Sequence, residues 1–454
     1  MDGSNARTLN TRTLKFGGYH RRKSSREDIE ITHVGRGTPG GEYLRRFWHP
    51  VALTSELGDL PLAIRILDEE LVLFRDGSGQ IGLLHRRCSH RNTSLEYGFI
   101  QERGIRCCYH GWHYDIDGTI LETPGEPPRS RIKDKLCHGA YPTREFHGLV
   151  FAYMGPPDEM PDFPLYDAFV YPEGNEMVPY KILNPCNWLQ AHENGADPIH
   201  TCFLHARGNQ LQFSEQYTAL PEISFHETPI GMLSVATRRW DDYLWIRASD
   251  VILPNAAQFG LSEIANEEKF ALVPWLSRWI VPIDDTSAYA IGLRHFNPII
   301  DPREVGDRDG IGLGKVDFAG QVAPPSYEAG QRNPGDHEAL VAQGPVTIHD
   351  NETLGITDVG VIMCRKQIRQ GIRAVAKGEP LAWPCRGTNA PVSTYNLELV
   401  SRVPPLPDVD DTETVRRFGV RVAEVVIGSG GLPPGKRHET AKALVADLIA
   451  REFS

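Results

Sequence analysis

The sequence predicts an α+β protein in which a small all-β domain precedes a larger domain of antiparallel sheet and helices. Short runs of β-branched and aromatic residues, bounded by Asp, Gly and Pro, fill the region from Pro50 to about Gly155. A proline-rich passage at 155–164 then interrupts this pattern and indicates a domain boundary. Beyond it, strand-like runs mix with helix-like patterns. With 454 residues, the chain is long enough to form two hydrophobic cores.

The first domain is predicted from its strands and turns. Strand-like runs occur at 62–67, 70–74 and 149–153. The stretches 76–79 and 117–118 have the Asp-Gly composition of hairpin turns, which join neighbouring antiparallel strands. These features indicate a small domain made of antiparallel β structure.

The second domain is predicted to combine a sheet with long helices. Residues 187–205 have a helix-like pattern, and 356–375 carry apolar residues at the period of a helix. A further amphipathic helix is expected at 439–453, whereas the Gly, Pro and Asp content of 301–335 indicates a long surface loop. Antiparallel strands are expected at 232–236, 244–246 and 288–292.

The charge and cysteine content exclude several classes of protein. The formal net charge is -11, so the chain lacks the basic surface that nucleic acids and anionic membranes require. No run approaches the ~18 apolar residues of a membrane span, and no apolar block resembles a signal peptide. The 8 cysteines are too few for a secreted disulfide framework, which predicts a cytoplasmic protein with thiols free to bind metal.

Glycines near the N-terminus have the spacing of a dinucleotide-binding loop. Gly35, Gly37 and Gly40 form a Gly-x-Gly-x-x-Gly pattern between a strand-like run at 29–33 and a helix-like run. No alternating series of strands and helices follows, and Pro39 lies inside the pattern. The expected structure is therefore a Gly/Pro turn that leads into a helix.

Two short clusters of cysteine and histidine carry the clearest chemical signal. Cys88 and His90 form a Cys-x-His pair, and Cys107 and His110 form a Cys-x-x-His pair with sixteen residues between the two clusters. Two thiolates and two imidazoles can bind a structural zinc ion. They can also bind a Rieske [2Fe–2S] cluster, in which two histidines replace two cysteines on one iron. The spacing alone permits both sites.

A second stretch, from Asn194 to His205, indicates a further metal site. Asp197 and His200 are three residues apart and therefore share one face of a helix. His205 lies five residues beyond His200, so an irregular turn is needed to bring the two imidazoles together. Two imidazoles and a carboxylate from elsewhere would form the facial triad of a mononuclear non-haem Fe(II) oxygenase, with open positions for dioxygen.

The residues around both clusters resemble those of a known family. The sequence from Cys88 to Trp112 is similar to the Rieske motif of ring-hydroxylating oxygenases, and that from Asn194 to His205 resembles the iron-binding motif of their catalytic domain. The resemblance implies a Rieske domain with an N-terminal helix at 32–160 and a helix-grip-like catalytic domain at 161–454. It covers about residues 32–380. Residues 1–31 are expected to be a flexible extension.

The resemblance also implies the ligands of both metal centres. Cys88 and Cys107 would bind one iron of the cluster, and His90 and His110 the other. Cys108 also precedes His110 closely, but the family pattern is Cys-x-x-His and favours Cys107. His200 and His205 would bind the mononuclear iron.

The third ligand of that iron is expected to be Asp336. In the phthalate dioxygenase-like branch, this aspartate stands eight residues before the glycine of a Gly-Pro-hydrophobe turn, as Asp336 does before Gly344. The chain departs from that branch at Gly335, where glutamine is usual. Asp350 and Asp358 therefore remain alternatives.

The function implied by the resemblance is that of a terminal oxygenase component. Such a component uses O2, and electrons from a separate NAD(P)H-dependent flavin and ferredoxin-type reductase, to hydroxylate or O-demethylate an aromatic, carboxylated or methoxylated substrate. The family forms homotrimers or dimers of trimers, and the residue at the position of Asp197 would connect the cluster of one subunit to the iron of the next. A substrate carboxylate could bind to arginines of the catalytic half, namely Arg207, Arg238, Arg239 and Arg247.

Two other functions remain open on the sequence alone. A Rieske-type electron-transfer protein without oxygenase activity would not need Asp197, His200 and His205. A zinc-stabilised binding protein would use the cysteine and histidine clusters for structure alone.

Overall fold

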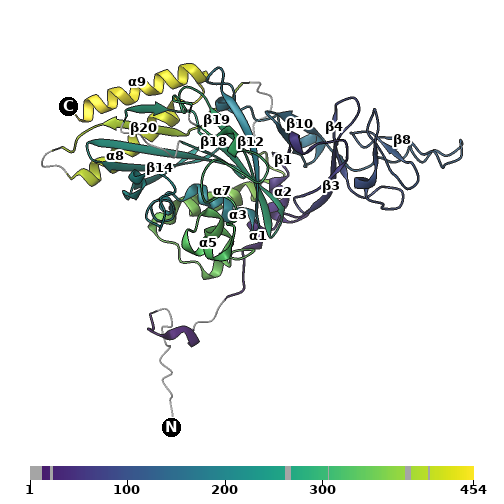
Figure 1. The fold of residues 1–454 in the computed structure, drawn as a ribbon, viewed down its shortest axis with the longest axis horizontal. Coiled ribbons are helices and arrows are strands. Elements are labelled where there is room, and N and C mark those ends of the chain that lie inside the picture. The colour runs from purple at the N-terminus through teal and green to yellow at the C-terminus, as the bar shows by residue number, and fades with distance from the viewer. Residues whose placement is uncertain are drawn as a thin grey trace, which may run out of the picture.

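Two lobes of different composition make up the molecule (Figure 1). The computed structural model describes residues 13–20, 24–260, 267–304, 306–383, 390–406 and 410–453. The smaller lobe contains the strands from β1 to β11 and projects to one side, whereas the larger lobe is built on one long antiparallel sheet. This is the predicted α+β architecture, and the all-β first domain and the sheet-and-helix second domain are confirmed.

The smaller lobe consists of three small antiparallel sheets. Their strand orders are β1-β11-β10, β2-β3-β4-β9 and β5-β6-β7-β8. The predicted turn at 76–79 joins β3 to β4, and the turn at 117–118 joins β7 to β8. The strands are β1 (Trp48–Leu53), β2 (Leu62–Ile66), β3 (Glu69–Arg75), β4 (Ile81–His85), β5 (Phe99–Ile100), β6 (Ile105–Arg106), β7 (His113–Tyr114), β8 (Ile120–Glu122), β9 (Ala140–Tyr141), β10 (Thr143–Phe146) and β11 (Leu149–Tyr153).

The larger lobe is organised by a sheet of nine strands. Its main order is β12-β19-β18-β16-β15-β14-β13, and β20 pairs with both β15 and β17. The predicted strands at 232–236, 244–246 and 288–292 lie within β14, β15 and β19. The strands are β12 (Glu176–Asn184), β13 (Glu222–Thr228), β14 (Gly231–Trp240), β15 (Tyr243–Ile252), β16 (Ala256–Phe259), β17 (Lys269–Ala271), β18 (Leu276–Asp284), β19 (Ser287–Phe296) and β20 (Leu397–Arg402).

Helices cover this sheet. The two helices predicted near 356–375 and 439–453 are present as α7 and α9, while α8, which packs on β13 and β14, was not predicted. Residues 301–335 contain the short helix α5 within the expected loop. The helices are α1 (Ile29–Thr32), α2 (Pro39–Leu44), α3 (Trp188–Glu193), α4 (His200–Phe203), α5 (Tyr327–Arg332), α6 (Asp336–Val341), α7 (Val359–Ala376), α8 (Asp411–Gly428) and α9 (Pro434–Glu452).

The glycine pattern near the N-terminus forms a turn and a helix, as expected. Thr38 caps α2 by accepting a hydrogen bond from the backbone N–H of Gly41, and α2 packs against α7. The strand expected at 29–33 is wrong, because Ile29–Thr32 forms one helical turn, α1. Of the predicted flexible extension, 1–12 and 21–23 lie outside the described residues.

Polar contacts join the two lobes. The turn between β2 and β3 reaches the end of β18, where the N–H of Leu67 donates to the carbonyl of Pro282. A buried ion pair joins Lys181 on β12 to Glu56, with 2.9 Å between the Lys181 Nζ and Glu56 Oε1 atoms. These contacts hold the smaller lobe against one end of the large sheet.

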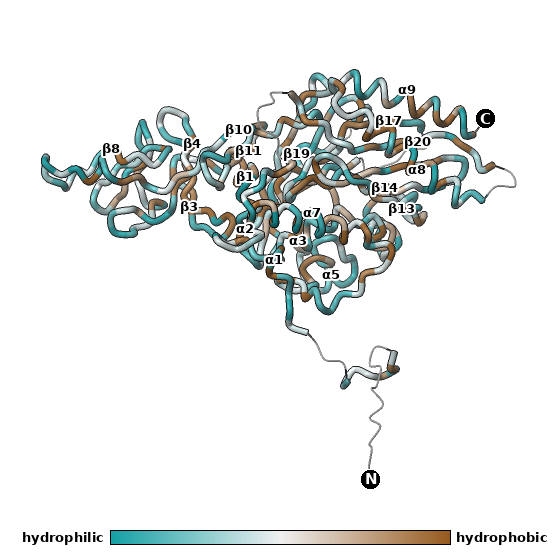
Figure 2. Tube along the Cα trace, turned by 180° about the vertical axis from the view of Figure 1, so that it is seen from behind, coloured by the Kyte–Doolittle hydropathy of each residue, from teal (hydrophilic) through white to brown (hydrophobic). Residues whose placement is uncertain are grey.

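Hydrophobic residues are concentrated along the central strands of the large sheet, as Figure 2 shows, whereas the loops around β8 are mostly hydrophilic. One extended core runs from the helices α1 and α2 through β1 and β11 into the large sheet and α8. A second, smaller core in the first lobe includes Cys88 and Cys107. Among the described residues, no helix has the length and apolar character needed to cross a membrane.

Candidate metal centres

The segment that carries the predicted iron ligands is a broken helix. The sequence indicated a helix-like segment over 187–205 with an irregular turn after His200, but α3 ends at Glu193 and α4 begins only at His200. Pro198 explains the break, because a residue before proline is disfavoured in the helical conformation, and Asp197 is extended. The break turns His200 toward His205, which follows the end of α4.

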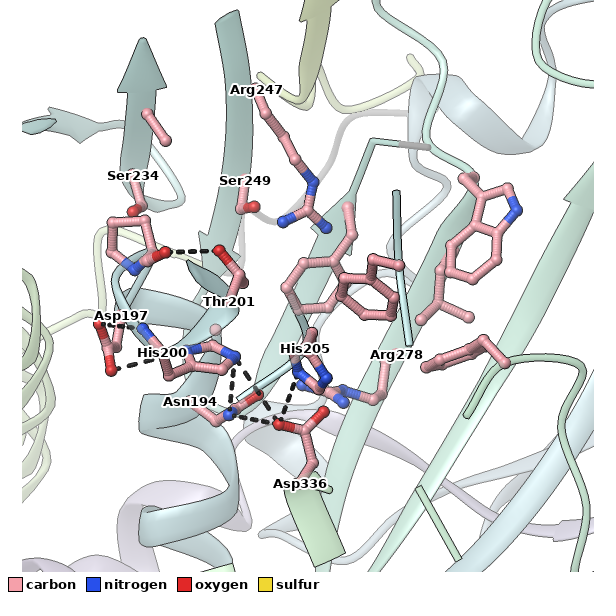
Figure 3. Close-up of a pocket in the computed structure, with 18 of the residues that line it drawn as sticks. Asn194, Asp197, His200, Thr201, His205, Ser234, Arg247, Ser249, Arg278 and Asp336 are labelled. Atoms are coloured by element: carbon pink, nitrogen blue, oxygen red, sulfur yellow. Dashed lines mark hydrogen bonds and ion pairs between the residues drawn. The ribbon is translucent and has the colours of Figure 1, made fainter. Parts of the chain in front are cut away.

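The imidazoles of His200 and His205 converge on the carboxylate of Asp336 (Figure 3). The Nε2 atom of His205 lies 3.2 Å from Oδ1 of Asp336, and the Nε2 atom of His200 lies 3.7 Å from the same oxygen. The three ligand atoms lie within 4.8 Å of one another. One nitrogen from each of two histidines and one carboxylate oxygen form the donor set of a facial triad.

Polar contacts on the outer side of each side chain fix this arrangement. Asp197 lies 3.5 Å from Nδ1 of His200, and Gln212 lies 2.8 Å from Nδ1 of His205, so both Nε2 atoms are directed inward. Gln321 donates to Oδ2 of Asp336 and leaves Oδ1 directed at the histidines. Partners of this kind orient metal ligands and set the tautomer of each imidazole.

The electrostatic environment keeps Asp336 ionised. Burial alone would raise the pKa of this carboxyl, but His205 and His200 and the hydrogen bond from Gln321 hold the pKa well below its usual value. Burial would lower the pKa of His200, whereas the contact with Asp197 and the charge of Asp336 raise it. A buried carboxylate that stays charged is suited to binding a divalent cation.

The two alternative carboxylates lie elsewhere. Asp350 accepts a hydrogen bond from the hydroxyl of Ser24, and Asp358 accepts one from the backbone N–H of Gly355. The structure also explains the unusual Gly335 before Asp336. A Cβ atom at Gly335 would lie 2.2 Å from the Cα of Gly320, so no larger side chain fits there.

The cysteine and histidine clusters come together on two loops of the smaller lobe. Cys88 follows β4, and Cys107 and His110 lie between β6 and β7. The cysteines are buried and close enough that Cys88 contributes, after burial, to raising the pKa of Cys107 to about 11. The rings of His90 and His110 lie 4.5 Å apart. Cys108, the competing thiol, is exposed.

This arrangement separates a pair of thiols from a pair of imidazoles. A zinc ion would need all four donors at about 2.0–2.3 Å from one point. Among the described residues, the set of His200, His205 and Asp336 is the one group whose donors meet around a single ion, and the cysteine–histidine quartet is not such a group. Two pairs of unlike donors fit a binuclear centre in which each iron has its own ligand type.

Two aromatic residues lie against the cysteine and histidine side chains: Trp112, which belongs to the motif named from the sequence, and Tyr114, which the sequence did not single out. The hydroxyl of Tyr114 lies 2.9 Å from Sγ of Cys88, and Tyr114 is fully buried. Trp112 stacks on His90 with 4.9 Å between ring centres. Trp112 directly follows Gly111, and Tyr114 lies two residues further on. Their closeness to the motif was the signal in the sequence that could have identified them.

A cavity of about 650 Å³ opens beside the His200, His205 and Asp336 cluster. Strands β14, β15 and β18 contribute Arg238, Arg247 and Arg278 to its wall. Figure 3 shows Arg247 and Arg278 beside the cluster. Of the arginines considered from the sequence, Arg238 and Arg247 therefore lie in the cavity. Arg278 was missed, although a lone arginine within the apolar strand β18 is a signal of buried polar function.

The other two arginines have structural partners. Arg207 donates to the carbonyl of Thr218, and Arg239 forms an ion pair with Asp411 at the start of α8.

Comparisons with known proteins agree with this geometry. A family model described as the Rieske [2Fe-2S] domain matches residues 47–142. The chain is 43% identical over 430 residues to the tert-butanol monooxygenase / tert-amyl alcohol desaturase oxygenase subunit of Aquincola tertiaricarbonis, which covers 90% of this chain and 91% of that one. It is 36% identical over 383 residues to the phenoxybenzoate dioxygenase subunit alpha of Ectopseudomonas oleovorans, covering 80% and 88%.

A third relative is the 5,5'-dehydrodivanillate O-demethylase oxygenase subunit of Sphingobium sp.. It is 33% identical over 368 residues and covers 78% of this chain and 82% of its own length. The relatives thus span both lobes, and each is named as an oxygenase subunit or the subunit of a dioxygenase.

Solved structures share the fold. Pseudomonas putida CBB5 NdmA with caffeine superposes with a TM-score of 0.56 at 21% identity, covering 77% of this chain and 98% of that chain. Dicamba monooxygenase bound to dicamba gives a TM-score of 0.54 at 18% identity, with coverage of 74% and 99%. Since the matched relatives extend over both lobes, the chain belongs to the Rieske non-haem iron oxygenases of the phthalate dioxygenase-like branch, as an oxygenase subunit that carries a Rieske [2Fe–2S] cluster and a mononuclear iron.

Proposed function

We propose that His200, His205 and Asp336 bind the mononuclear iron and that Cys88, Cys107, His90 and His110 bind the [2Fe–2S] cluster of a terminal oxygenase. The observation that carries this proposal is the convergence of two Nε2 atoms and one carboxylate oxygen within 4.8 Å at the edge of a cavity. When bound there, the cluster would supply electrons one at a time, and the iron would provide open positions for dioxygen beside an organic substrate.

The protein positions the reactants around these groups. Gln212 and Asp197 hold the histidines from behind, and Gln321 holds the carboxylate, so the open side of the iron site faces the cavity. Phe213 stacks on His205 with 4.2 Å between ring centres and so covers one face of that imidazole. A substrate in the cavity would thereby be held beside the iron, between aromatic and polar side chains of the cavity wall.

We propose that Asp197 connects the [2Fe–2S] cluster of one subunit to the mononuclear iron of the next. One of its oxygens accepts from the backbone N–H of Ile199, and the other lies beside His200. Its side chain remains 33% exposed, so it can also accept a hydrogen bond from a histidine of a second copy. The clusters lie in the projecting lobe, which supports an assembly in which the lobe of one subunit meets the large lobe of another, as in a homotrimer or dimer of trimers.

We propose an aromatic substrate that carries a carboxylate or methoxy group. Aromatic side chains line the cavity, and two relatives are named for phenoxybenzoate and for dehydrodivanillate. The names of relatives include both dioxygenases and an O-demethylase, so hydroxylation and O-demethylation are both within this class.

The remaining components follow from the same proposal. Electrons would come from a separate NAD(P)H-dependent flavin and ferredoxin-type reductase, and reduced thiols support a cytoplasmic location. We place the domain boundary at 160/161, between the Rieske domain at 32–160 and the catalytic domain at 161–454.

Oxygen uptake tests this function directly. The purified enzyme, supplied with a reductase and NADH, is offered a panel of aromatic acids and methoxyaromatics under isotopically labelled dioxygen. We expect oxygen uptake that depends on the presence of a substrate, and we expect the isotopic label to appear in the product. If the iron-loaded enzyme accepted electrons but consumed no oxygen with any substrate of the panel, the proposal would be contradicted. That result would favour a Rieske-type electron-transfer protein without oxygenase activity.

A further inference from the structure

We propose that residues 24–32 form a strap that holds the iron-binding segment in place, and that Asp28 and Arg369 are positioning residues of the mononuclear iron site. This inference rests on the proposed function, because it concerns the ligands of that iron. None of the described residues that line the cavity belongs to the strap, so its effect on the iron passes through the elements between them.

The beginning of the strap lies along the short turn before α7. The backbone N–H of Ser24 donates to the side chain of Asn351, and the Asn351 amide donates to the Ser24 carbonyl, both at 3.2 Å. The hydroxyl of Ser24 donates to Asp350 at 2.8 Å. The N–H of Asp28 donates to Nδ1 of His349 at 3.2 Å. This part of the strap is therefore bound to the turn at several successive positions.

Asp28 also joins the strap to α7. Its carboxylate pairs with the guanidinium group of Arg369, and Glu30 pairs with the same group at 3.1 Å. The side chains of Asp28 and Arg369 are 24% and 26% exposed, so this pair is partly withdrawn from solvent and is screened less by salt than an exposed pair. At this place α1 contacts both α7 and α3 (Figure 1).

A buried network of charges continues from α7 to the iron-binding segment. Arg365 lies one turn before Arg369, and its guanidinium group contacts Glu352 at 2.6 Å and Glu193 at 2.5 Å. The side chains of Arg365 and Glu193 are each 10% exposed. Glu193 is the last residue of α3. The position of α7 is thus coupled to the end of α3 by buried charges that are costly to separate.

Asn194, which follows α3, carries this coupling to the iron ligands. Its side-chain amide donates to Oδ1 of Asp336 at 3.1 Å and lies 3.2 Å from Nε2 of His200. Helix α3 also reaches α6, because Gln190 donates to the carbonyl of Leu340 at 2.9 Å. A displacement of α3 would therefore move the histidine segment relative to Asp336. Since a metal site tolerates errors of only about 0.2 Å in its ligand distances, such a displacement weakens iron binding.

The other end of α3 contacts the strap directly. Asn187 caps α3 by accepting a hydrogen bond from the N–H of Leu189, and its amide donates to the carbonyl of Thr32 at 2.9 Å. Asn187 and Thr32 are both buried. The hydroxyl of Thr32 donates in turn to the carbonyl of Asp28 at 2.9 Å. Asp28 is therefore connected to both ends of the helix that leads into the iron-binding segment.

Iron release from the full-length, iron-loaded enzyme tests this proposal. The protein is mixed with an excess of a ferrous chelator, and the loss of the mononuclear iron is followed over time. We expect Arg369→Gln and Asp28→Asn to lose this iron about three- to tenfold faster than the wild type. That is less than the ~10- to 100-fold loss of affinity that follows removal of a ligand's direct partner. Asp28→Glu keeps the charge and should release iron at nearly the wild-type rate.

The EPR signal of the cluster is recorded in the same samples. It should be unchanged in all three variants, because α3 and α7, against which Asp28 and Arg369 lie, belong to the larger lobe. Loss of the cluster together with the iron would show general unfolding and would contradict a positioning role.

Two further arginine variants serve as controls. Arg373→Gln removes an exposed arginine one turn beyond Arg369 on α7 and should release iron at the wild-type rate. Arg239→Gln removes the ion pair with Asp411 at the start of α8 and should lower the thermal midpoint of the same lobe. It should not accelerate iron release at temperatures well below that midpoint. The comparison separates a positioning role from a general loss of stability.

The outcomes distinguish this proposal from the proposed function. If Arg369→Gln and Asp28→Asn release iron no faster than Arg373→Gln, the strap proposal is wrong and the proposed iron ligands stand. The same conclusion follows if Arg239→Gln releases iron as fast as the strap variants. If the wild type holds no iron beyond the cluster, or if His205→Ala retains that iron, the proposed ligand set is wrong and the strap proposal fails with it.

Discussion

The Nε2 atom of His205 lies 3.2 Å from Oδ1 of Asp336, although the two residues belong to separate segments of the chain. His205 follows α4, and Asp336 is the first residue of α6. The close approach of Gly335 to Gly320 allows α6 to begin at this point. The iron site therefore depends on a backbone contact between two glycines as well as on its ligands.

Removing Asp336 should empty the iron site and spare the cluster. We expect Asp336→Ala to lose the mononuclear iron and to reduce product formation by more than about 100-fold, because the two histidines lose their common partner. Metal analysis and turnover measure both effects. The control is Asp350→Ala, which removes a surface carboxylate bonded to Ser24 and should behave as the wild type. If Asp350→Ala lost the iron and Asp336→Ala kept it, Asp350 would be the ligand in place of Asp336.

Asp197→Asn should separate metal binding from turnover. The amide retains the size of the side chain, so iron and cluster should both remain bound. Electron delivery should fail, since the carboxylate beside His200 is lost, and we expect product formation to fall by at least about 100-fold. Rapid-mixing measurements of cluster oxidation would show the block. Near-normal product formation by this variant would exclude a role for Asp197 between subunits.

The hydroxyl of Tyr114 should raise the reduction potential of the cluster. It lies 2.9 Å from Sγ of Cys88, and a hydrogen bond to a ligand sulfur stabilises the more negative, reduced cluster. Tyr114→Phe should lower the potential by roughly 40–90 mV, the equivalent of one such bond. A redox titration followed by circular dichroism measures the shift. An unchanged potential would mean that the hydroxyl does not donate to the sulfur.

Asp250 should make stability depend on pH. Burial raises the pKa of Asp250 to about 7, although its Oδ2 accepts a hydrogen bond from the backbone N–H of Tyr395. Between about pH 4 and pH 7 the folded protein holds a proton that the unfolded chain has released, so stability falls as pH rises through this window. The full effect is at most about 4 kcal/mol.

Asp250→Asn removes this titration and keeps an acceptor for Tyr395. The thermal midpoints of the two proteins are compared at about pH 5 and about pH 7. The midpoint of the variant relative to that of the wild type should be higher at about pH 7 than at about pH 5. If the thermal midpoints of wild type and variant changed in parallel with pH, Asp250 would be ionised in the folded protein.

The proposed ligands could be singled out from the sequence because the members of each pair lie within a few residues of each other. Cys88 with His90 and Cys107 with His110 keep their spacing on two loops. Asp336 required the family pattern, since no local signal joins it to His205. The helix-like segment at 187–205 breaks before His200, earlier than the sequence indicated, because the effect of Pro198 on Asp197 outweighed the helical pattern around it.

Other features were missed for different reasons. The helix α8 has an apolar face and Asp410 as its N-cap, so its signal was present in the sequence. Arg278 could not be recognised as a residue of the cavity, because its place there depends on how β18 packs in the folded protein. The same holds for Gln321, whose contact with Asp336 joins a loop to the first residue of α6.

The content and EPR spectrum of the metal centres test the central claim most directly. Iron, sulfide and zinc are counted per chain in the wild type and in His205→Ala, and the reduced proteins are examined by EPR. The wild type should show a Rieske signal and one iron beyond those of the cluster. The variant should retain the signal and the sulfide but lose that extra iron. A colourless protein containing zinc without sulfide, or a variant that keeps the extra iron, would contradict this account.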